Sequence, residues 1–332
     1  MCEREHKILS PLAAFADETR GREAPEEECS IRTPFQRDRD RIIHSSSFRR
    51  LKHKTQVFLS PEGDYYRTRL THTLEVAQIA RTIACALQLN EDLTEAIALA
   101  HDLGHTPFGH AGERALNEVC ENGFAHYRQS LRVVDRIEKS GQGLNLTWEV
   151  RNGIVTHTCG EKAATLEGRT VRVADRIAYI NHDIDDAQNA GIMCEFDIPR
   201  HLRDELGHSK SERINTLVLD VIKNSGGDIV MSPRTHEAFE ELHSFMFKKV
   251  YTNPVCKSEE SKAVSMLQRL YSYFTENSAS MPDSYRKIAE TDGVNTAACD
   301  YIAGMTDTFA IRVYKELFIP EAWAEKLRFD RL

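Results

Sequence analysis

Residues 101–113 read His-Asp-Leu-Gly-His-Thr-Pro-Phe-Gly-His-Ala-Gly-Glu, a stretch that combines helix-breaking residues with histidines and carboxylates. Glycine and proline inside a helical pattern end or kink the helix. Gly104, Pro107 and Gly109 lie close together here. The stretch therefore predicts the end of one helix, a short break and the beginning of a second helix.

The same thirteen positions carry three histidines and two carboxylates. His101 and Asp102 are adjacent, and His105 follows one helical turn later. Beyond the break, His110 and Glu113 are three positions apart, a spacing at which side chains on one helix touch. We interpret the first group as a metal-binding pair and the second as a histidine–carboxylate dyad. Because short motifs also arise by chance, this interpretation depends on residues elsewhere in the chain.

Two predicted helices bring histidines toward this stretch. Residues 69–89 have the apolar pattern of an amphipathic helix, and His72 lies on its apolar stripe. Asn90 is a suitable N-cap for the next helix, whose apolar stripe leads to His101. A buried histidine needs a polar partner. We therefore expect each helix to deliver one histidine to a shared interior.

A further helix is predicted over residues 166–190. Asp175, Tyr179 and Asp183 recur there at intervals of four, which places a phenol between two carboxylates on one face. A solvent-exposed polar face is the simpler interpretation of this pattern. The ring beside the inner carboxylate of Asp175 favours the wall of a pocket at least equally.

Helical periodicity dominates the remaining sequence, with no convincing series of strands, no internal repeat and no low-complexity tract. Further helices are predicted at residues 111–121, 128–139, 145–157, 214–222, 236–250, 261–274 and 297–317. We predict an all-α protein with a polar, loosely packed arm at residues 1–30. A helical core at residues 31–200 and a C-terminal helical region at residues 201–332, packed on the core, complete the predicted organisation.

The composition is that of a globular protein with an ample core, since 41% of the 332 residues are hydrophobic and 28% are charged. A net charge of −8 argues against a general attraction to nucleic acid or to an anionic membrane. The first residues are charged, and no segment approaches the roughly 18 apolar residues of a membrane span. We expect a cytoplasmic protein with no membrane partner. The eight cysteines include no Cys-x-x-Cys pair, which predicts reduced thiols.

A metal site can be assembled from His72, His101, Asp102 and Asp175. Two neutral imidazoles and two carboxylates balance the charge of one divalent cation and leave positions open for water and a substrate oxygen. Mixed nitrogen and oxygen ligands do not choose among Mn²⁺, Fe²⁺, Co²⁺, Zn²⁺ and Mg²⁺. The set predicts a hydrolytic metal centre of undecided metal identity.

The order of these four residues resembles the ligand set of the HD-domain phosphohydrolases. Longer stretches look like the bacterial deoxyguanosinetriphosphate triphosphohydrolase-like branch, namely residues 41–58, 101–113, 143–151, 174–186 and 300–307. The resemblance covers nearly everything after residue 30. It implies an HD-domain helical bundle with a C-terminal helical extension. It also implies metal-dependent hydrolysis of deoxynucleoside triphosphates, dGTP or several of them, at the α-phosphorus to give deoxynucleoside and inorganic triphosphate.

In such a reaction the 5′-oxygen is a poor leaving group that needs a proton. His110 is the candidate donor, and Glu113 would orient its ring and favour the imidazolium. The reverse role, in which this dyad activates water, stays open. The resemblance implies further roles: Arg69 and His105 would hold phosphate oxygens, Gln56 and Asp183 would bind the sugar 3′-hydroxyl, and Tyr179 would pack on the sugar and exclude a 2′-hydroxyl.

Two parts of the sequence are ambiguous. His157 either reaches the phosphates or has a structural role. Residues 126–129, His-Tyr-Arg-Gln, depart from the family pattern, which often has Asn at the second position. Any role of this segment in the site is therefore open.

Alternative functions remain at this point. An HD-domain site could instead act on a nucleoside monophosphate or a cyclic dinucleotide, because a fold and its metal ligands do not determine the substrate. A sensor of nucleotide or single-stranded nucleic acid is a third alternative, although a sensor does not need the His110–Glu113 dyad. The resemblance implies a homo-oligomer, commonly a hexamer in the family, and leaves base preference and a second, regulatory deoxynucleotide undecided.

Overall fold

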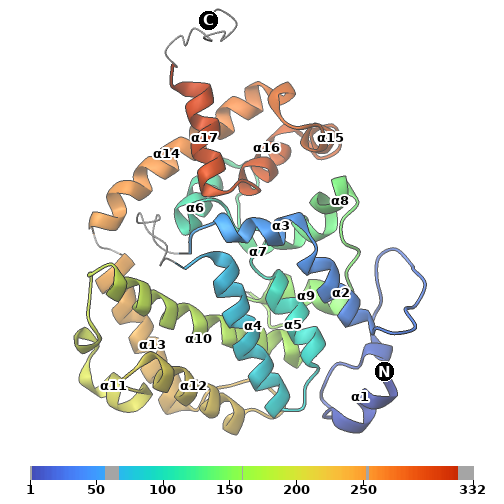
Figure 1. Ribbon diagram of the computed structural model, residues 1–332, viewed down its shortest axis with the longest axis vertical. Coiled ribbons are helices and arrows are strands. Elements are labelled where there is room, and N and C mark those ends of the chain that lie inside the picture. The colour runs from blue at the N-terminus through green and yellow to red at the C-terminus, as the bar shows by residue number, and fades with distance from the viewer. Residues whose placement is uncertain (1, 57–66, 159, 252–253, 321–332) are drawn as a thin grey trace, which may run out of the picture.

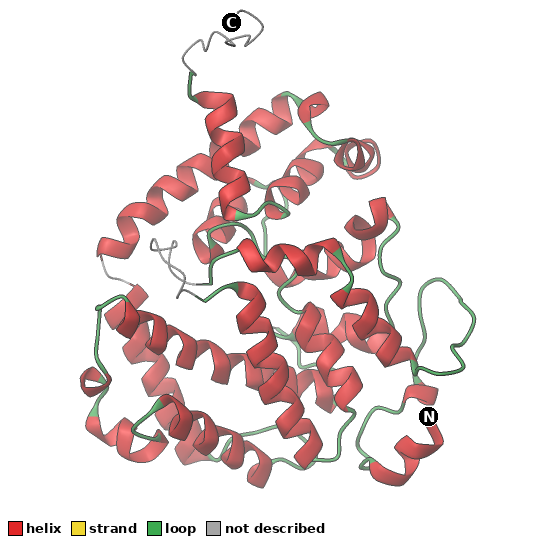
Figure 2. Cartoon of the chain, in the orientation of Figure 1, coloured by secondary structure: helices red, strands yellow, loops and turns green. Residues whose placement is uncertain are grey.

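The computed structural model describes residues 2–56, 67–158, 160–251 and 254–320. Within these ranges the chain forms helices joined by loops and turns, with no β-strand, as Figures 1 and 2 show. The prediction of an all-α protein is confirmed. None of the described helices is both long enough and apolar enough to cross a bilayer.

The helices of the first part of the chain run from the N-terminus to the end of the longest one, α10. They are α1 (Cys2–Ile8), α2 (Pro34–Ile43), α3 (Ser46–Arg50), α4 (Arg69–Ala86), α5 (Glu91–Ala100), α6 (Gly109–Val119), α7 (His126–Arg132), α8 (Glu138–Gly141), α9 (Trp148–Thr156) and α10 (Leu166–Asn189).

The remaining helices form the C-terminal part of the molecule. They are α11 (Arg200–Leu206), α12 (Lys210–Asn224), α13 (Pro233–Met246), α14 (Pro254–Glu276), α15 (Asp283–Asp292), α16 (Val294–Ala303) and α17 (Asp307–Phe318). The sequence predicted one helical segment over residues 297–317, and the structure divides it into α16 and α17. Thr306 explains the division, because its side chain accepts a hydrogen bond from Phe309 N and so caps a new helix.

The centre of the molecule is the packing of α4 against α5 and α10, with α2 and α9 alongside (Figure 1). The apolar stripe of α4 is buried as predicted, and Val76 and Ile83 have no exposed surface. Asn90 caps α5 by accepting a hydrogen bond from Leu93 N at 3.2 Å. Both histidines that the sequence placed on these stripes, His72 and His101, are buried.

The predicted helix break is present. Helix α5 ends at Ala100, and α6 begins at Gly109 after Phe108, whose φ is +62°. Gly104 lies so close to α7 that a Cβ atom there would be 2.1 Å from Ser130 N. Only glycine allows this approach. The loop between α5 and α6 is therefore fitted tightly against the rest of the core.

The C-terminal helices hold this loop from the other side. Asp307 Oδ1 accepts a hydrogen bond from Phe108 N at 3.0 Å, and Oδ2 accepts from Thr55 N and Oγ1 at 3.0 and 2.7 Å. The buried Lys54 donates to the carbonyl oxygens of His105 and Ala303. Residues separated by some 250 positions in sequence thus meet at the loop between α5 and α6.

The expectation of a loosely packed arm at residues 1–30 was wrong for much of its length. Glu5 of α1 accepts hydrogen bonds from Ala16 N at 2.8 Å and from Asn90 Nδ2 at 3.2 Å. Glu149 of α9 accepts from Arg20 N at 2.8 Å. These bonds to the core residues Asn90 and Glu149 hold a segment whose polar composition alone suggested mobility.

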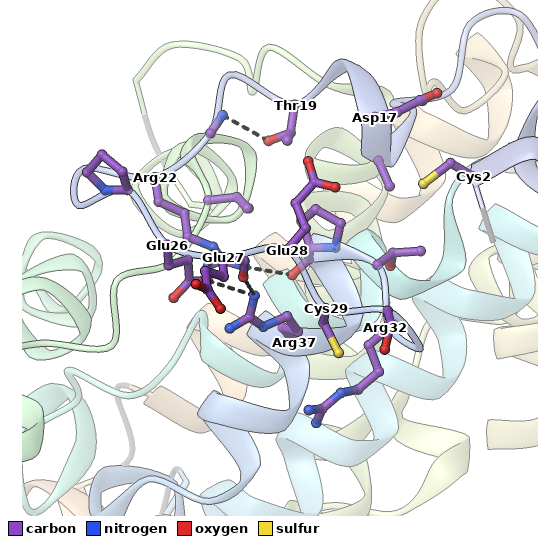
Figure 3. A pocket seen from close by; sticks show the side chains of 17 residues that line it. Cys2, Asp17, Thr19, Arg22, Glu26, Glu27, Glu28, Cys29, Arg32 and Arg37 are labelled. Atoms are coloured by element: carbon purple, nitrogen blue, oxygen red, sulfur yellow. Dashed lines mark hydrogen bonds and ion pairs between the residues drawn. The ribbon is translucent and has the colours of Figure 1, made fainter.

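The rest of this segment lines a cavity of about 450 Å³ beside α2 (Figure 3). Arg37 lies under the acidic turn there, where it donates to Glu27 O at 2.7 Å and pairs with Glu26 at 3.3 Å.

The division of the chain at residues 30 and 200 stays a prediction.

The expectation of reduced cysteines was wrong for one pair. Cys120, which follows α6, and Cys299 of α16 form a disulfide across 179 positions of sequence. Sequence spacing could not reveal this pair, because packing brings the two Cα atoms to 6.7 Å. Cys2, Cys29, Cys85 and Cys194 are free thiols.

Candidate functional site

The four predicted metal ligands converge from three helices. His72 lies in the first turn of α4, His101 and Asp102 follow α5, and Asp175 lies in α10. His72 Nε2 is 3.1 Å from Asp175 Oδ1 and 3.9 Å from Asp102 Oδ2. His101 Nε2 is 3.4 Å from Asp102 Oδ1 and 3.7 Å from Asp175 Oδ1. The four side chains therefore face one small interior space.

The chemistry of His101 fits a metal ion in that space. His101 Nδ1 is 2.6 Å from the carbonyl oxygen of Ala98, and because a carbonyl only accepts, Nδ1 carries the hydrogen. His101 Nε2 is buried and has no hydrogen-bond partner among the described residues. In neutral imidazole this nitrogen holds a lone pair, and here it faces two carboxylates. A divalent cation is the natural partner of such an arrangement.

The charges in the site lead to the same conclusion. Burial lowers the pKa of His101, but the carboxylates of Asp102 and Asp175 outweigh burial and raise this pKa to about 9. Burial also raises the pKa of Asp102, but nearby His101, His105 and Arg69 hold it well below its usual range. The carboxylates thus require positive charge beside them, which a proton on His101 or a divalent cation can supply.

Two predicted phosphate ligands contact Asp102. Arg69 Nη1 donates to Asp102 Oδ2 at 2.8 Å, and His105 Nε2 lies 3.1 Å from Asp102 Oδ1. Burial, and next the charge of Arg69, hold the pKa of His105 well below its usual range. Arg69 Nε and His105 Nδ1 are buried without hydrogen-bond partners among the described residues. Arg69 and His105 therefore each have one nitrogen available to bind a further group.

The predicted dyad is present, but Glu113 is shared. His110 Nδ1 lies 3.6 Å from Glu113 Oε2, while Glu113 Oε1 accepts from His126 N and contacts His126 Nδ1, both at 2.9 Å. Burial raises the pKa of Glu113, but its contacts with His110 and His126 outweigh burial and hold this pKa far below its usual range. His110 is half-exposed, and its Nε2 lies 3.3 Å from the hydroxyl of Tyr179.

A cavity of about 230 Å³ adjoins these groups. It is lined by Gln56, Arg69, His72, Asp102, His105, His110, His126, Thr158, Asp175, Arg176, Tyr179, Phe239 and His243. Of the predicted site residues, His101, Glu113 and Asp183 do not line it. His101 and Glu113 contact residues that do line it.

The two buried residues predicted to bind the sugar differ in their partners. Gln56 Oε1 has no hydrogen-bond partner among the described residues. A buried polar group without a partner is costly, so this oxygen is suited to a bound hydroxyl. Burial, and next the charge of Asp186, raise the pKa of Asp183 well above its ordinary value, against the effect of a hydrogen bond with Tyr179.

The sequence left the role of His126 undecided and did not indicate His182 as a site residue. His126 contacts Glu113, and its ring stacks on that of His105 with centroids 4.0 Å apart. His182 Nδ1 lies 3.0 Å from His72 Nδ1. Its position seven residues after Asp175, two helical turns along α10, was a usable signal.

The α13 residues Phe239 and His243 were also missed, and nothing local in the sequence marks them as lining the cavity. His157, whose role was ambiguous, donates from Nδ1 to Ile154 O at 2.7 Å, and its ring lies 5.0 Å from that of His101. Burial, and next the charge of His101, lower the pKa of His157 to about 4. His157 is therefore neutral at physiological pH.

The metal assignment predicts the behaviour of Asp102→Ala. The variant should bind markedly less transition metal than the parent protein, because it loses one of two carboxylates in the site. Metal content of purified protein, measured by elemental analysis, tests this. Asp204→Ala, in an exposed carboxylate of α11, is the control and should keep the parent's content. Equal metal content in Asp102→Ala and the parent would refute the assignment.

Two parts of the chain match known protein families. Residues 69–180 match the HD domain, and residues 229–316 match the phosphohydrolase-associated domain. A deoxyguanosinetriphosphate triphosphohydrolase-like protein from Caldanaerobacter subterraneus subsp. tengcongensis is 57% identical over 330 residues, which cover 99% of this chain and 97% of the relative. A protein of the same description from Desulfatibacillum aliphaticivorans is 49% identical, covering 96% of this chain and 97% of the relative.

Solved structures are also similar to this chain. A hypothetical protein from Aquifex aeolicus is 21% identical with a TM-score of 0.49, and the match covers 86% of this chain and 68% of that one.

Proposed function

The chain belongs to the deoxyguanosinetriphosphate triphosphohydrolase-like family of HD-domain phosphohydrolases, and on this premise we propose that it hydrolyses deoxynucleoside triphosphates at the α-phosphorus. The products are deoxynucleoside and inorganic triphosphate. One observation carries the proposal: a buried imidazole nitrogen without a partner faces two carboxylates at the edge of a cavity lined by histidines and arginines.

His72, His101, Asp102 and Asp175 would hold the divalent metal, which when bound would supply Lewis-acid chemistry at the α-phosphate and to the attacking water. The protein contributes the fixed positions of the ligands, since His101 is held by the carbonyl of Ala98 and Asp102 by Arg69.

Arg69 and His105 hold phosphate oxygens. Arg69 Nε carries a hydrogen that no described residue accepts, so it can donate to a phosphate oxygen. His105 lines the same cavity, and its Nδ1 has no partner among the described residues either. The two side chains flank Asp102, which places the phosphates next to the metal ligands.

His110 donates the proton to the leaving 5′-oxygen. Its ring lies at the cavity, half-exposed, and Glu113 behind it is ionised and oriented by His126. A general acid must be held within reach of the leaving oxygen, and Glu113 Oε2 lies 3.6 Å from His110 Nδ1. Glu113 thus acts by positioning the ring of His110.

The sugar lies against Tyr179 and Gln56, which line the cavity, and Gln56 Oε1 accepts from the 3′-hydroxyl, which gives this oxygen the partner that it lacks. Asp183, one helical turn after Tyr179 and outside the cavity lining, is the second acceptor that the family resemblance implies. The ring of Tyr179 packs on the sugar at its 2′ position, where ribose carries a hydroxyl and deoxyribose does not.

The bond that is cut tests the function directly. Purified protein with Mn²⁺ or Mg²⁺ should convert deoxynucleoside triphosphates to deoxynucleoside and intact triphosphate, resolved by ion-exchange chromatography. In ¹⁸O-labelled water the label should enter the triphosphate, because water attacks phosphorus and the 5′-oxygen leaves with the nucleoside. Orthophosphate or pyrophosphate as the first product, or label in the 5′-hydroxyl, would contradict the proposal.

The role of His110 predicts the behaviour of His110→Ala. Loss of one general acid should lower kcat by about 10² to 10⁴. Metal content should be that of the parent, because His110 is not a ligand. Glu113→Gln should lose less activity than His110→Ala, since it removes a charge from behind the ring and leaves the ring in place. The assignment fails if His110→Ala keeps parental kcat in steady-state assays.

The place of Tyr179 predicts a preference for deoxyribose. A hydroxyl forced against the ring should make kcat/KM for GTP lower than that for dGTP by about 10² or more. Tyr179→Ala should narrow this ratio by accepting GTP better. Equal kcat/KM for the two nucleotides in the parent protein would show that the ring does not exclude the 2′-hydroxyl.

A further inference from the structure

A chain of hydrogen bonds leads away from the metal ligand His72 on the side opposite the site. His72 Nδ1 lies 3.0 Å from His182 Nδ1, and His182 Nε2 lies 2.9 Å from Glu75 Oε2. Glu75 is one helical turn after His72 on α4, and His182 is on α10. Both histidines are buried, each with 1% of its side chain exposed. Glu75, His182 and the metal ligand His72 thus form one continuous chain of hydrogen bonds.

Glu75 fixes the direction of these hydrogen bonds. Burial raises the pKa of Glu75, but the hydrogen bond from His182, together with the charges of Arg67 and Lys210, outweighs burial and lowers this pKa to about 2. An ionised carboxylate only accepts, so His182 Nε2 carries a hydrogen and donates. In a neutral ring the other nitrogen, Nδ1, is then an acceptor.

These bonds determine which nitrogen of His72 carries the hydrogen. Two imidazole nitrogens 3.0 Å apart share one hydrogen, and with His182 Nδ1 accepting, His72 Nδ1 must donate. The hydrogen of neutral His72 is then on Nδ1, which leaves a lone pair on Nε2. His72 Nε2 is the atom that faces Asp102 and Asp175. The chain of bonds therefore presents His72 in the tautomer that a metal ion needs.

The other histidine ligand is oriented differently. His101 Nδ1 donates to the carbonyl oxygen of Ala98 within its own helical turn, and no side chain is required. His72 Nδ1 instead lies 3.0 Å from a side chain of another helix, the ring of His182 on α10. The orientation of His72 therefore depends on His182 and, through it, on Glu75.

Glu75 is itself held by cations at the surface. Arg67 Nε lies 3.0 Å from Glu75 Oε2, and Lys210, in the first turn of α12, lies 3.9 Å from Oε1. Arg67 also pairs with Asp185 and Asp186 of α10 at 3.2 and 3.0 Å. This ionic network keeps the Glu75 carboxylate charged and in place beside His182.

We propose that His182 and Glu75 are positioning residues for the metal centre, which hold His72 with Nε2 free to bind the divalent ion. The inference rests on the metal site of the proposed function and adds two residues that do not touch the ion. It concerns metal affinity and is separate from the choice of substrate.

Mn²⁺ affinity tests the inference without any substrate. His182→Phe keeps a ring of similar size and removes both nitrogens, so the Kd for Mn²⁺, measured from free Mn²⁺ by electron paramagnetic resonance, should rise about 10- to 100-fold. Glu75→Ala should raise Kd in the same direction. Glu75→Gln, whose amide oxygen can still accept from His182 Nε2, should recover part of the loss.

A matched control separates this role from the surrounding ionic network. Asp186→Asn removes a carboxylate that pairs with the same Arg67 but is not part of the hydrogen-bond chain from Glu75 through His182 to His72, and it should keep the parent's Kd. Thermal unfolding adds a second readout. In EDTA the midpoint of Glu75→Gln should stay near the parent's, while the rise in midpoint on adding Mn²⁺ should be smaller, since that rise depends on Kd.

The outcomes are distinct. An unchanged Mn²⁺ affinity in folded His182→Phe, or in Glu75→Ala if the first variant does not fold, overturns the inference. An equal loss in Asp186→Asn also overturns it, because the network as a whole would then be responsible. A parent protein that binds no Mn²⁺ overturns it as well. If the parent binds Mn²⁺ and the variants weaken binding but no deoxynucleotide is cleaved, the proposed function fails and this inference stands.

Discussion

Two carboxylates that converge on one buried imidazole nitrogen, those of Asp102 and Asp175, set the main constraint on this protein. Buried negative charge is stable only beside positive charge or hydrogen-bond donors. Arg69 and His105 supply such donors to Asp102, and His72 lies against Asp175. The packing of α4, α5 and α10 brings these groups together, so the core of the fold and the site are formed by the same contacts.

The C-terminal region completes the site from outside the segment that matches the HD domain. Asp307 and Lys54 hold the backbone of the loop between α5 and α6, which positions His105 and the start of the helix that carries His110. Phe239 and His243 of α13 line the cavity. Because these contacts join distant parts of the sequence, damage to α13 or α17 should disturb the site as directly as damage to the HD segment.

The corrected expectations share one physical cause. The polar segment at residues 1–30 lacks periodicity, but long-range hydrogen bonds from Asn90 to Glu5 and from Arg20 to Glu149 join it to the core. The sequence spacing of Cys120 and Cys299 does not indicate a disulfide, but the packing of the helices brings the two residues together. In both cases the partner lies far away in the chain. Glu113, by contrast, lies near His110 as expected, and it lies closer still to His126, from a nearby segment whose role the sequence left open.

The sequence by itself determined the helical class, the break at Gly104 and Gly109, and the four metal-ligand candidates. Helical periodicity and breaker residues are local features of the chain. The residue types of a ligand set are likewise visible in their order along the chain. It also proposed Gln56, Arg69, His105, Tyr179 and Asp183 by resemblance. The tertiary structure alone decided which atoms face the metal space, which buried atoms lack partners, and that His182 and Glu75 stand behind His72. Those facts depend on distances of a few ångströms between helices, and the pattern of residues along one helix does not contain the position of its neighbours.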